Sequence, residues 1–252
     1  MGTGNDGTGP RTADIPEALG LLTRLPVPMR APRGGPAAWA WPVAGLAVGA
    51  LAWAAGASAL ALGLTPALAA GAALAASVLV TGALHEDGLA DSADGLWGGR
   101  ERARRLEIMK DSRIGAYGVI ALVLGIGLHW AALAALAGTG GLAGGLLAAA
   151  ALSRAAMAGL MAALPPARPD GLARSVGRPP ARTAWLAGGI GAASALVALG
   201  PAGIWAILLA AGIAWGWGAL ARRRIGGQTG DILGAAQQLV SIAVLCVAVA
   251  AA

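Results

Sequence analysis

The stretch GAYGVIALVLGIGLHWAALAALA, residues 115–137, contains no Asp, Glu, Lys or Arg. A helix needs about 20 such residues to cross the hydrocarbon core of a bilayer, so this stretch predicts a transmembrane helix. We therefore expect an all-α fold, a polytopic integral membrane helical bundle of about seven transmembrane helices. The six other apolar stretches lie at about 39–64, 66–85, 139–164, 183–199, 201–220 and 232–251.

The composition supports this class of protein. Of the 252 residues, 57% are hydrophobic and 12% are charged, whereas soluble domains are about 25% charged. The hydrophobicity excludes a disordered chain, and the single Cys246 excludes a disulfide scaffold. We expect one membrane-embedded domain over residues 1–252, with a polar and partly flexible segment at 1–35. This segment lacks the apolar core of a cleavable signal peptide, and we expect none.

The positions of the charges predict the orientation in the membrane. The turns near 65–66, 138–141 and 200–201 are short and uncharged. Basic residues gather in the other loops, which predicts that those loops and the N-terminus face the cytoplasm. The net charge of +6 is then a topology signal, and we expect no binding of nucleic acid. The basic positions are Arg24, Arg30 and Arg33, then those within 86–113, 168–182 and 222–224.

One acidic segment stands out, GALHEDGLADSADGLWGG at residues 82–99, which continues directly from an apolar stretch. On a helix, Asp87, Asp91 and Asp94 share one narrow stripe, because they are spaced i, i+4 and i+7. Gly88 and Gly95 fall beside that stripe, where the lack of a side chain lets a phosphate or another backbone approach.

Three carboxylates on one stripe repel each other unless a cation neutralises them. Carboxylate oxygens suit Mg²⁺ or Mn²⁺, with water and substrate phosphate in the remaining positions. Asp87, Asp91 and Asp94 are therefore the predicted metal ligands. The alternative is an acidic, solvated helix end that lies in a loop.

Cations follow the acidic segment. Lys110 and Arg113 bracket Asp111 and could hold a pyrophosphate near the metal, or they belong to a basic cytoplasmic loop. Arg154 lies inside an apolar stretch, where an arginine normally faces a polar cavity or a partner. It either pairs with the aspartates or binds substrate phosphate.

A second polar patch, RRRIGGQTGDILGAAQQ at residues 222–238, predicts a flexible loop that leads into a helix N-terminus. Unpaired backbone N–H groups at such an end bind anions. Gln228, Thr229 and Asp231 are the candidate residues, although Asp231 could instead be a plain helix cap. The predicted topology puts this patch on the same cytoplasmic face as Asp87, which favours one shared site.

Four strings resemble the cobalamin synthase family, that is, adenosylcobinamide-GDP ribazoletransferases. They are TRLPVP (23–28), LHEDGLADSADG (84–95), LEIMKDSRIGAYG (106–118) and GGQTGDILGA (226–235). The resemblance implies a Mg²⁺-dependent, multi-pass enzyme of the bacterial cytoplasmic (inner) membrane, with its active site facing the cytoplasm. Its substrates would be adenosylcobinamide-GDP and α-ribazole or α-ribazole 5′-phosphate, and it would release GMP. Whether the chain forms a homo-oligomer is left open.

The resemblance implies that the ribazole hydroxyl attacks the phosphorus attached to cobinamide, in line with the GMP leaving group. The metal would stabilise the oxygens around that phosphorus, and one of the carboxylates of the stripe, or Asp111, would accept the proton. The predicted catalytic residues are Asp87, Asp91, Asp94, Lys110 and Asp111, and the predicted substrate-binding residues are Gly88, Gly95, Arg113, Arg154, Gln228, Thr229 and Asp231.

Two alternatives differ from this hypothesis. A CDP-alcohol phosphotransferase also uses an aspartate-rich helix and displaces a nucleoside monophosphate. Its motif places Ala-Arg after the Asp-Gly pair, whereas Leu89 and Ala90 follow here. A transporter with an acidic cation site would bury its charges near the midplane. In this chain the charges gather instead at one predicted membrane face.

Overall fold

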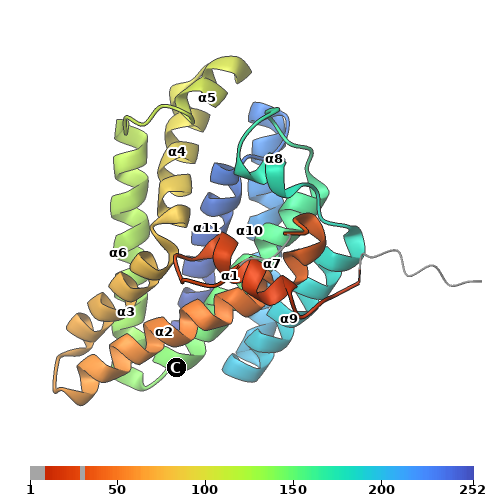
Figure 1. Cartoon of the computed structure of the whole chain (residues 1–252). Helices are drawn as coiled ribbons and strands as arrows, with labels where there is room; N and C mark the ends of the chain where they lie inside the picture. The colour runs from red at the N-terminus through yellow and green to blue at the C-terminus, as the bar shows by residue number, and fades with distance from the viewer. Residues whose placement is uncertain (1–8, 29–31) are drawn as a thin grey trace, which may run out of the picture.

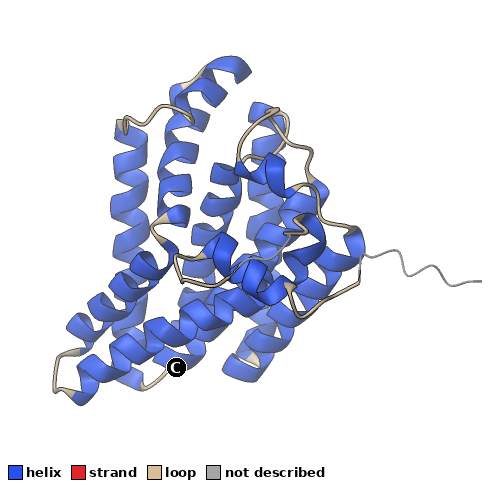
Figure 2. Cartoon of the chain, viewed as in Figure 1, coloured by secondary structure: helices blue, strands red, loops and turns tan. Residues whose placement is uncertain are grey.

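The computed structural model describes residues 9–28 and 32–252 (Figure 1). The expectations for residues 1–8 and 29–31, Arg30 among them, lie outside the described residues. The described chain is helical, and it contains no strand (Figure 2). Its elements are α1 (Asp14–Leu22), η1 (Gly35–Ala40), α2 (Trp41–Ala61), α3 (Pro66–Thr81), α4 (Leu84–Gly98), α5 (Arg102–Ile108), α6 (Ala116–Thr139), α7 (Leu142–Ala163), α8 (Leu172–Val176), α9 (Ala181–Leu199), α10 (Ala202–Ile225) and α11 (Gly230–Ala250).

Six helices of the described chain are long and apolar enough to cross a membrane, namely η1 with α2, then α6, α7, α9, α10 and α11. Large apolar side chains such as Trp185 and Val197 are exposed on the outside of the bundle, where lipid would cover them. The prediction of a polytopic all-α membrane protein is confirmed. The count reaches seven when α3 and α4 are taken as one bent span.

The prediction for the second span, residues 66–85, is wrong in one respect. The acidic segment does not continue the α3 helix, because the chain bends by 85° between α3 and α4. Gly82 (φ 66°) and Ala83 (φ 58°) adopt left-handed conformations at the bend. Gly82 tolerates this conformation, whereas Ala83 is strained by its Cβ. A side chain at residue 82 would also collide with Arg24, which packs over the bend.

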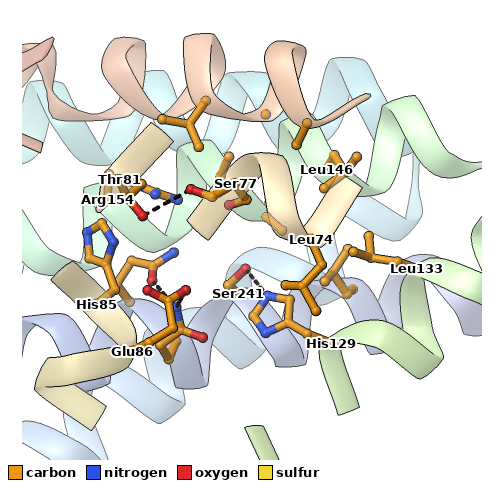
Figure 3. Close-up of a pocket in the computed structure, with 18 residues that line it drawn as sticks. Leu74, Ser77, Thr81, His85, Glu86, His129, Leu133, Leu146, Arg154 and Ser241 are labelled. Carbon is orange, nitrogen blue, oxygen red and sulfur yellow. Dashed lines mark hydrogen bonds between the residues drawn. The ribbon is translucent and has the colours of Figure 1, made fainter. Parts of the chain in front are cut away.

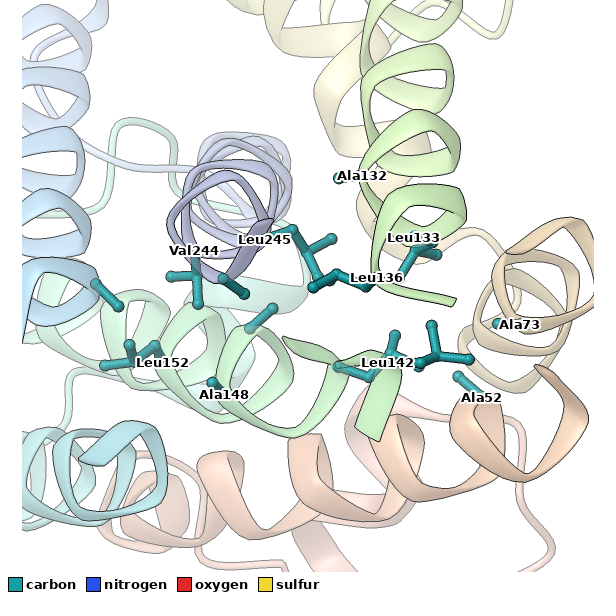
Figure 4. Close-up of a cluster of buried hydrophobic side chains, with 14 of the residues drawn as sticks. Ala52, Ala73, Ala132, Leu133, Leu136, Leu142, Ala148, Leu152, Val244 and Leu245 are labelled. Atoms are coloured by element: carbon teal, nitrogen blue, oxygen red, sulfur yellow. The ribbon is translucent and has the colours of Figure 1, made fainter. Parts of the chain in front are cut away.

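The core of the bundle lies around α7 and α11. Leu136, Leu142, Val244 and Leu245 contact each other there and are almost fully buried (Figure 4). Small residues let the surrounding helices approach closely, since a Cβ at Gly45 of α2 would lie 2.3 Å from a backbone oxygen of α7. Such contacts replace the hydrophobic driving force that is absent between helices in lipid.

The described part of the N-terminal segment is anchored. α1 packs against α2 and η1, and the buried Asp14 forms a 2.7 Å ion pair with Arg33. Glu17 accepts hydrogen bonds from the backbone N–H groups of Arg33 and Gly34. The sequence analysis treated residues 1–35 as a polar segment and did not foresee this helix.

The two kinds of loop lie at opposite ends of the molecule. Figure 1 shows α5 and α8, which lie within the charged connections, towards the top of the view. The uncharged turns that join α2 to α3, α6 to α7 and α9 to α10 lie towards the bottom. The alternation expected from the sequence is therefore present in three dimensions.

Candidate active site

The acidic helix α4 packs between α6 and α11. At its crossing with α11, a Cβ on Gly88 would lie 2.9 Å from the Asp231 backbone oxygen and 3.2 Å from the Gly234 Cα. Only glycine fits at this distance. The crossing therefore brings Asp231 beside the carboxylates of α4.

The two glycines that flank the acidic stripe serve helix packing. The space beside Gly88 is filled by α11 backbone, and the space beside Gly95 by the Met109 side chain and the Arg105 backbone oxygen. The sequence predicted that either a phosphate or another backbone approaches these two glycines. In the structure, backbone approaches both of them. Neither glycine faces an open substrate site.

Asp87, Asp91 and Asp231 form an acidic cluster, named here the carboxylate cluster. Asp91 is half-buried and experiences the negative charges of Asp87, Asp231 and Asp94. Arg168 is the nearby cation, with its Nη2 atom 3.5 Å from Asp231 Oδ2. Three carboxylates face one guanidinium, so the cluster attracts a further cation.

Asp94 has a different partner from the rest of its stripe. Its Oδ2 accepts a hydrogen bond of 2.7 Å from the Gly115 N–H, and its Oδ1 one of 2.9 Å from the Gly118 N–H. These amides begin α6, so Asp94 satisfies the N-terminus of that helix. The side chain is 7% exposed. Both of its carboxylate oxygens are therefore already hydrogen-bonded, unlike the oxygens of a carboxylate that is available to coordinate a metal ion.

An open cleft of about 440 Å³ lies on one side of the carboxylate cluster. Asp87, Asp91, Lys110 and Asp111 line it, together with Glu86. The structure thus brings the acidic helix and the loop after α5 together, as the sequence analysis expected. The cleft offers oxygen ligands on one wall and a cation on the other.

The cations beside this cleft are already paired. Lys110 forms an ion pair with Asp170, and Arg113 forms a 2.7 Å ion pair with Asp111. Hydrogen bonds from Arg113 lower the pKa of Asp111 to about 2. The Arg113 side chain is 87% exposed and does not line the cleft. A pyrophosphate could recruit Lys110 only in competition with Asp170.

A second cavity, of about 120 Å³, lies on the other side of the cluster. Asp87, Arg168, Asp231 and His85 supply its polar lining, and the rest of the lining is apolar or glycine and comes from α1, α2, α4, α7, α8 and α11. This chamber is named here the apolar cavity. Asp87 lines both the cleft and the apolar cavity, so it lies between the two spaces.

The loop before α11 is held in place. The Gln228 N–H donates to the Pro165 carbonyl, and the Ala167 N–H donates to the Gln228 carbonyl. The prediction of a flexible loop is therefore wrong, because these bonds tie it to the segment after α7. Thr229 is the helix cap, since its hydroxyl accepts from the Ile232 N–H at 3.3 Å. Asp231 is thereby left free of the capping role and faces Arg168.

Arg154 lies away from the cluster. It lines an enclosed cavity of about 30 Å³ together with His85, Glu86 and His129 (Figure 3). Its Nη1 donates to the Ser153 hydroxyl at 3.3 Å. The cavity has room for water but is too small for a phosphorylated substrate. Of the two roles predicted for Arg154, substrate binding does not fit this cavity. The acidic side chain whose charge acts on Arg154 is Glu86, and not one of the aspartates.

Further hydrogen bonds connect this buried cavity. Gln238 donates to Glu86 Oε1 at 2.9 Å, and His129 shares a bond of 3.0 Å with Ser241 (Figure 3). These groups hold α4, α6 and α11 together inside the bundle. His129 therefore helps to hold α6 against α11.

Arg168 was missed as a site residue. The sequence places it among the arginines of residues 168–182, and nothing in the spacing distinguishes it from them. In the structure it lines the apolar cavity and contacts Asp231. Its Nη1 atom is buried and has no hydrogen-bond partner among the described residues, so it can still receive a phosphate oxygen.

The carboxylate cluster suits Mg²⁺ through its chemistry, although it is no complete cage. Among residues 9–28 and 32–252, no three His, Cys, Asp or Glu side chains are placed to hold a metal ion by themselves. Mg²⁺ is usually held by one or two carboxylates, with water and substrate phosphates as the other ligands. Asp87 and Asp91, which both line the open cleft, fit that pattern as two carboxylates, whereas both oxygens of Asp94 are bonded to α6.

The fold and the site define a multi-span membrane protein that carries a carboxylate cluster between two cavities at one end of its bundle. The chain belongs to the cobalamin-5-phosphate synthase family, whose model matches residues 14–249. It is accordingly a transferase of cobalamin biosynthesis.

The similar curated proteins cover nearly the whole chain. A protein of Bradyrhizobium diazoefficiens is 51% identical over 94% of this chain and 94% of its own length. A protein of Mesorhizobium japonicum is 46% identical over 93% and 92%, and one of Rhizobium johnstonii is 44% identical over 92% and 95%. All three are named adenosylcobinamide-GDP ribazoletransferase. No solved structure matches the chain.

Proposed function

We propose that this chain joins adenosylcobinamide-GDP to α-ribazole or its 5′-phosphate and releases GMP, at the carboxylate cluster. The observation that carries the proposal is that Asp87 lines two separate cavities. A transfer between two substrates needs both to reach one reacting atom. The names of the relatives supply the two substrates.

The reaction makes one bond and breaks one. The acceptor hydroxyl oxygen attacks the phosphorus on the cobinamide side of the pyrophosphate. The bond from that phosphorus to the bridging oxygen breaks, and the bridging oxygen leaves with GMP. The hydroxyl proton passes to a carboxylate oxygen of the cluster, where Asp87 faces both substrates. Asp111 is a poor acceptor, because Arg113 holds its pKa at about 2.

Asp87 and Asp91 would hold Mg²⁺ together with water and substrate phosphate, with Asp231 as a nearby negative charge and Mn²⁺ as a substitute for Mg²⁺. When bound, the ion would supply charge stabilisation to the phosphate oxygens. Arg168 would donate its buried, unpartnered Nη1 N–H to the pyrophosphate, and Lys110 would exchange Asp170 for a phosphate oxygen. Arg168 thus takes the role that the sequence analysis considered for Arg154.

The cluster lies beside the charged loops, because Asp231 contacts Arg168 of the loop after α7 and Lys110 of the loop after α5 lines the cleft beside Asp91. Figure 1 shows α5 and α8, which lie within these loops, towards one end of the molecule. By the positive-inside rule this end faces the cytoplasm, and the membrane is the bacterial inner membrane.

The direct test uses the purified chain in detergent. With adenosylcobinamide-GDP, α-ribazole and Mg²⁺ it should release one GMP for each corrinoid product, as measured by chromatography. A folded preparation that releases no GMP with either α-ribazole or its 5′-phosphate would overturn the proposal. Cation flux in liposomes in place of GMP release would favour the transporter alternative.

A further inference from the structure

We infer that a groove between α7, α9 and α10 binds one anionic phospholipid of the surrounding bilayer, with an acyl chain in the groove and the phosphate on Arg182 and Arg222. The groove has a volume of about 600 Å³, and it is named here the α9–α10 groove. No residue of the carboxylate cluster lines it. The inference therefore does not depend on the proposed function.

The walls of the groove suit a hydrocarbon chain. Apolar side chains and glycines line it, among them Leu152, Leu160 and Ile207. None of the described residues that line it is charged. Since a cavity of about 150 Å³ accepts a benzene ring, the α9–α10 groove has room for a lipid acyl chain.

The floor of the groove is open. Gly159 of α7 and Gly188 and Gly189 of α9 line it, and a Cβ added at any of these three would meet no neighbouring atom within 4 Å. By contrast, a Cβ at Gly191 of α9 would lie 2.8 Å from the Ala155 Cβ of α7. One face of α9 is thus tightly packed, whereas the groove face leaves space that lipid fills, because an empty space forfeits its van der Waals contacts.

Two tryptophans show how deep the groove lies in the membrane. Trp185 and Trp215 both line it, and they lie equally many residues from Gly200, where the uncharged turn joins α9 to α10. The two rings are therefore at about the same depth, and they are 79% and 78% exposed. Exposed tryptophans at one level are typical of the boundary between hydrocarbon and headgroups.

Uncompensated positive charge lies beyond the tryptophans. Residues 171–230 include six arginines and no acidic residue. Arg182 and Arg222 are exposed, and neither forms an ion pair with a described residue. Their guanidinium groups are therefore available to a phosphate, which arginine binds through paired N–H groups.

These two arginines are aligned with the groove. Arg182 precedes Gly189 by seven residues, and Arg222 follows Trp215 by seven residues. Seven residues make about two helical turns, so each arginine lies on the groove face of its helix, towards the charged loops. A long arginine side chain extends from such a position to the headgroup level. The groove and the arginines are thus complementary to the acyl chain and the headgroup of one anionic lipid.

The test measures binding of phosphatidylglycerol to the delipidated chain in detergent by native mass spectrometry. We expect one tightly bound molecule per chain, with a Kd at least about tenfold below that of phosphatidylcholine with the same acyl chains. Gly189→Leu fills the groove without a collision, so it should weaken binding of both lipids at least about tenfold.

The matched control is Gly212→Leu. Gly212 is an exposed glycine of α10 with open space around it, and it does not line the groove. This change should leave both Kd values as they are. Both variants should melt at or above the unaltered temperature without lipid, because leucine favours a helix more than glycine does. A melting curve in detergent verifies that each variant is folded.

A second pair of variants tests the headgroup. Arg182→Gln combined with Arg222→Gln should weaken binding of phosphatidylglycerol to the level of phosphatidylcholine, whose own Kd should stay nearly unchanged. Arg174→Gln combined with Arg223→Gln removes the same net charge from exposed positions and should retain the preference for phosphatidylglycerol.

Three outcomes would overturn the inference. Equal binding of phosphatidylglycerol to Gly189→Leu and to the unaltered chain would place the lipid outside the groove. Equal affinity of the unaltered chain for the two lipids would exclude the arginines from the site. A dimer that binds no lipid and that Gly189→Leu dissociates would assign the groove to a second copy of the chain.

Discussion

Aspartates of one helix have different roles in this protein. Asp91 lies among like charges, whereas Asp94 accepts two backbone hydrogen bonds from the start of α6. Helical spacing correctly placed both on one stripe of α4. It could not reveal that a neighbouring helix begins at Asp94, since that contact joins residues far apart in the sequence. Whether an aspartate of this stripe caps a helix or coordinates a metal ion depends on the group that it contacts, and spacing alone does not reveal that group.

Asp94→Asn should therefore weaken the fold. An amide can accept from only one of the two N–H groups at the start of α6, and its own NH₂ would face the other. We expect a loss of about 1–2 kcal/mol in the free energy of unfolding, seen as a lower melting temperature in detergent. Asp91→Asn is the matched control, and it should melt at or above the unaltered temperature because a like charge is removed. Equal melting of Asp94→Asn and the unaltered protein would refute the capping role.

Arg168→Ala should affect turnover more than stability. Its guanidinium is the cation beside Asp231, and its Nη1 has no hydrogen-bond partner among the described residues. Removing one such donor reduces turnover by about 100-fold, measured as the rate of GMP release at saturating substrates. Arg174→Ala, a change of an arginine that lines neither cavity, should keep full activity. A full rate in Arg168→Ala would remove Arg168 from the site.

At the scale of elements, the transmembrane helices were predictable and the bend was not. Charge is excluded from lipid, so apolar runs reveal the spans directly. Glycines also occur inside other spans, for example Gly45 and Gly125, so Gly82 by itself does not mark the point where α3 ends. Arg168 was missed for a related reason, because its place at the cluster depends on how the loop after α7 is tied to Gln228.

The close crossing of α4 and α11 predicts that adding a single methyl group at Gly88 disturbs the site. Gly88→Ala places a Cβ 2.9 Å from the Asp231 backbone oxygen, so α11 must move and Asp231 moves with it. Such overpacking costs about 1–3 kcal/mol, and GMP release should fall together with thermal stability. Gly98→Ala, on the same helix, meets its nearest neighbour at an ordinary 3.6 Å and should change neither. Unchanged activity in Gly88→Ala would show that the crossing does not position the site.

At the scale of the whole molecule, the separation of charged and uncharged loops defines an orientation. The exposed Cys246 is first replaced by alanine. A cysteine at Gly138, beside an uncharged turn, should then react with a membrane-impermeant maleimide added outside spheroplasts. A cysteine at the exposed Ser112 should react only after the membrane is opened. The reverse pattern would place the carboxylate cluster outside the cytoplasm.

The central claim is that ribazole transfer takes place at the carboxylate cluster with Mg²⁺ bound there. The most direct measurement is the initial rate of GMP release from adenosylcobinamide-GDP and α-ribazole, for the unaltered protein and for Asp91→Asn. We predict turnover that stops on addition of EDTA, resumes with Mg²⁺, and falls at least about 100-fold in a normally melting Asp91→Asn variant. GMP release by Asp91→Asn at the unaltered rate, or turnover that is indifferent to EDTA, would contradict the account.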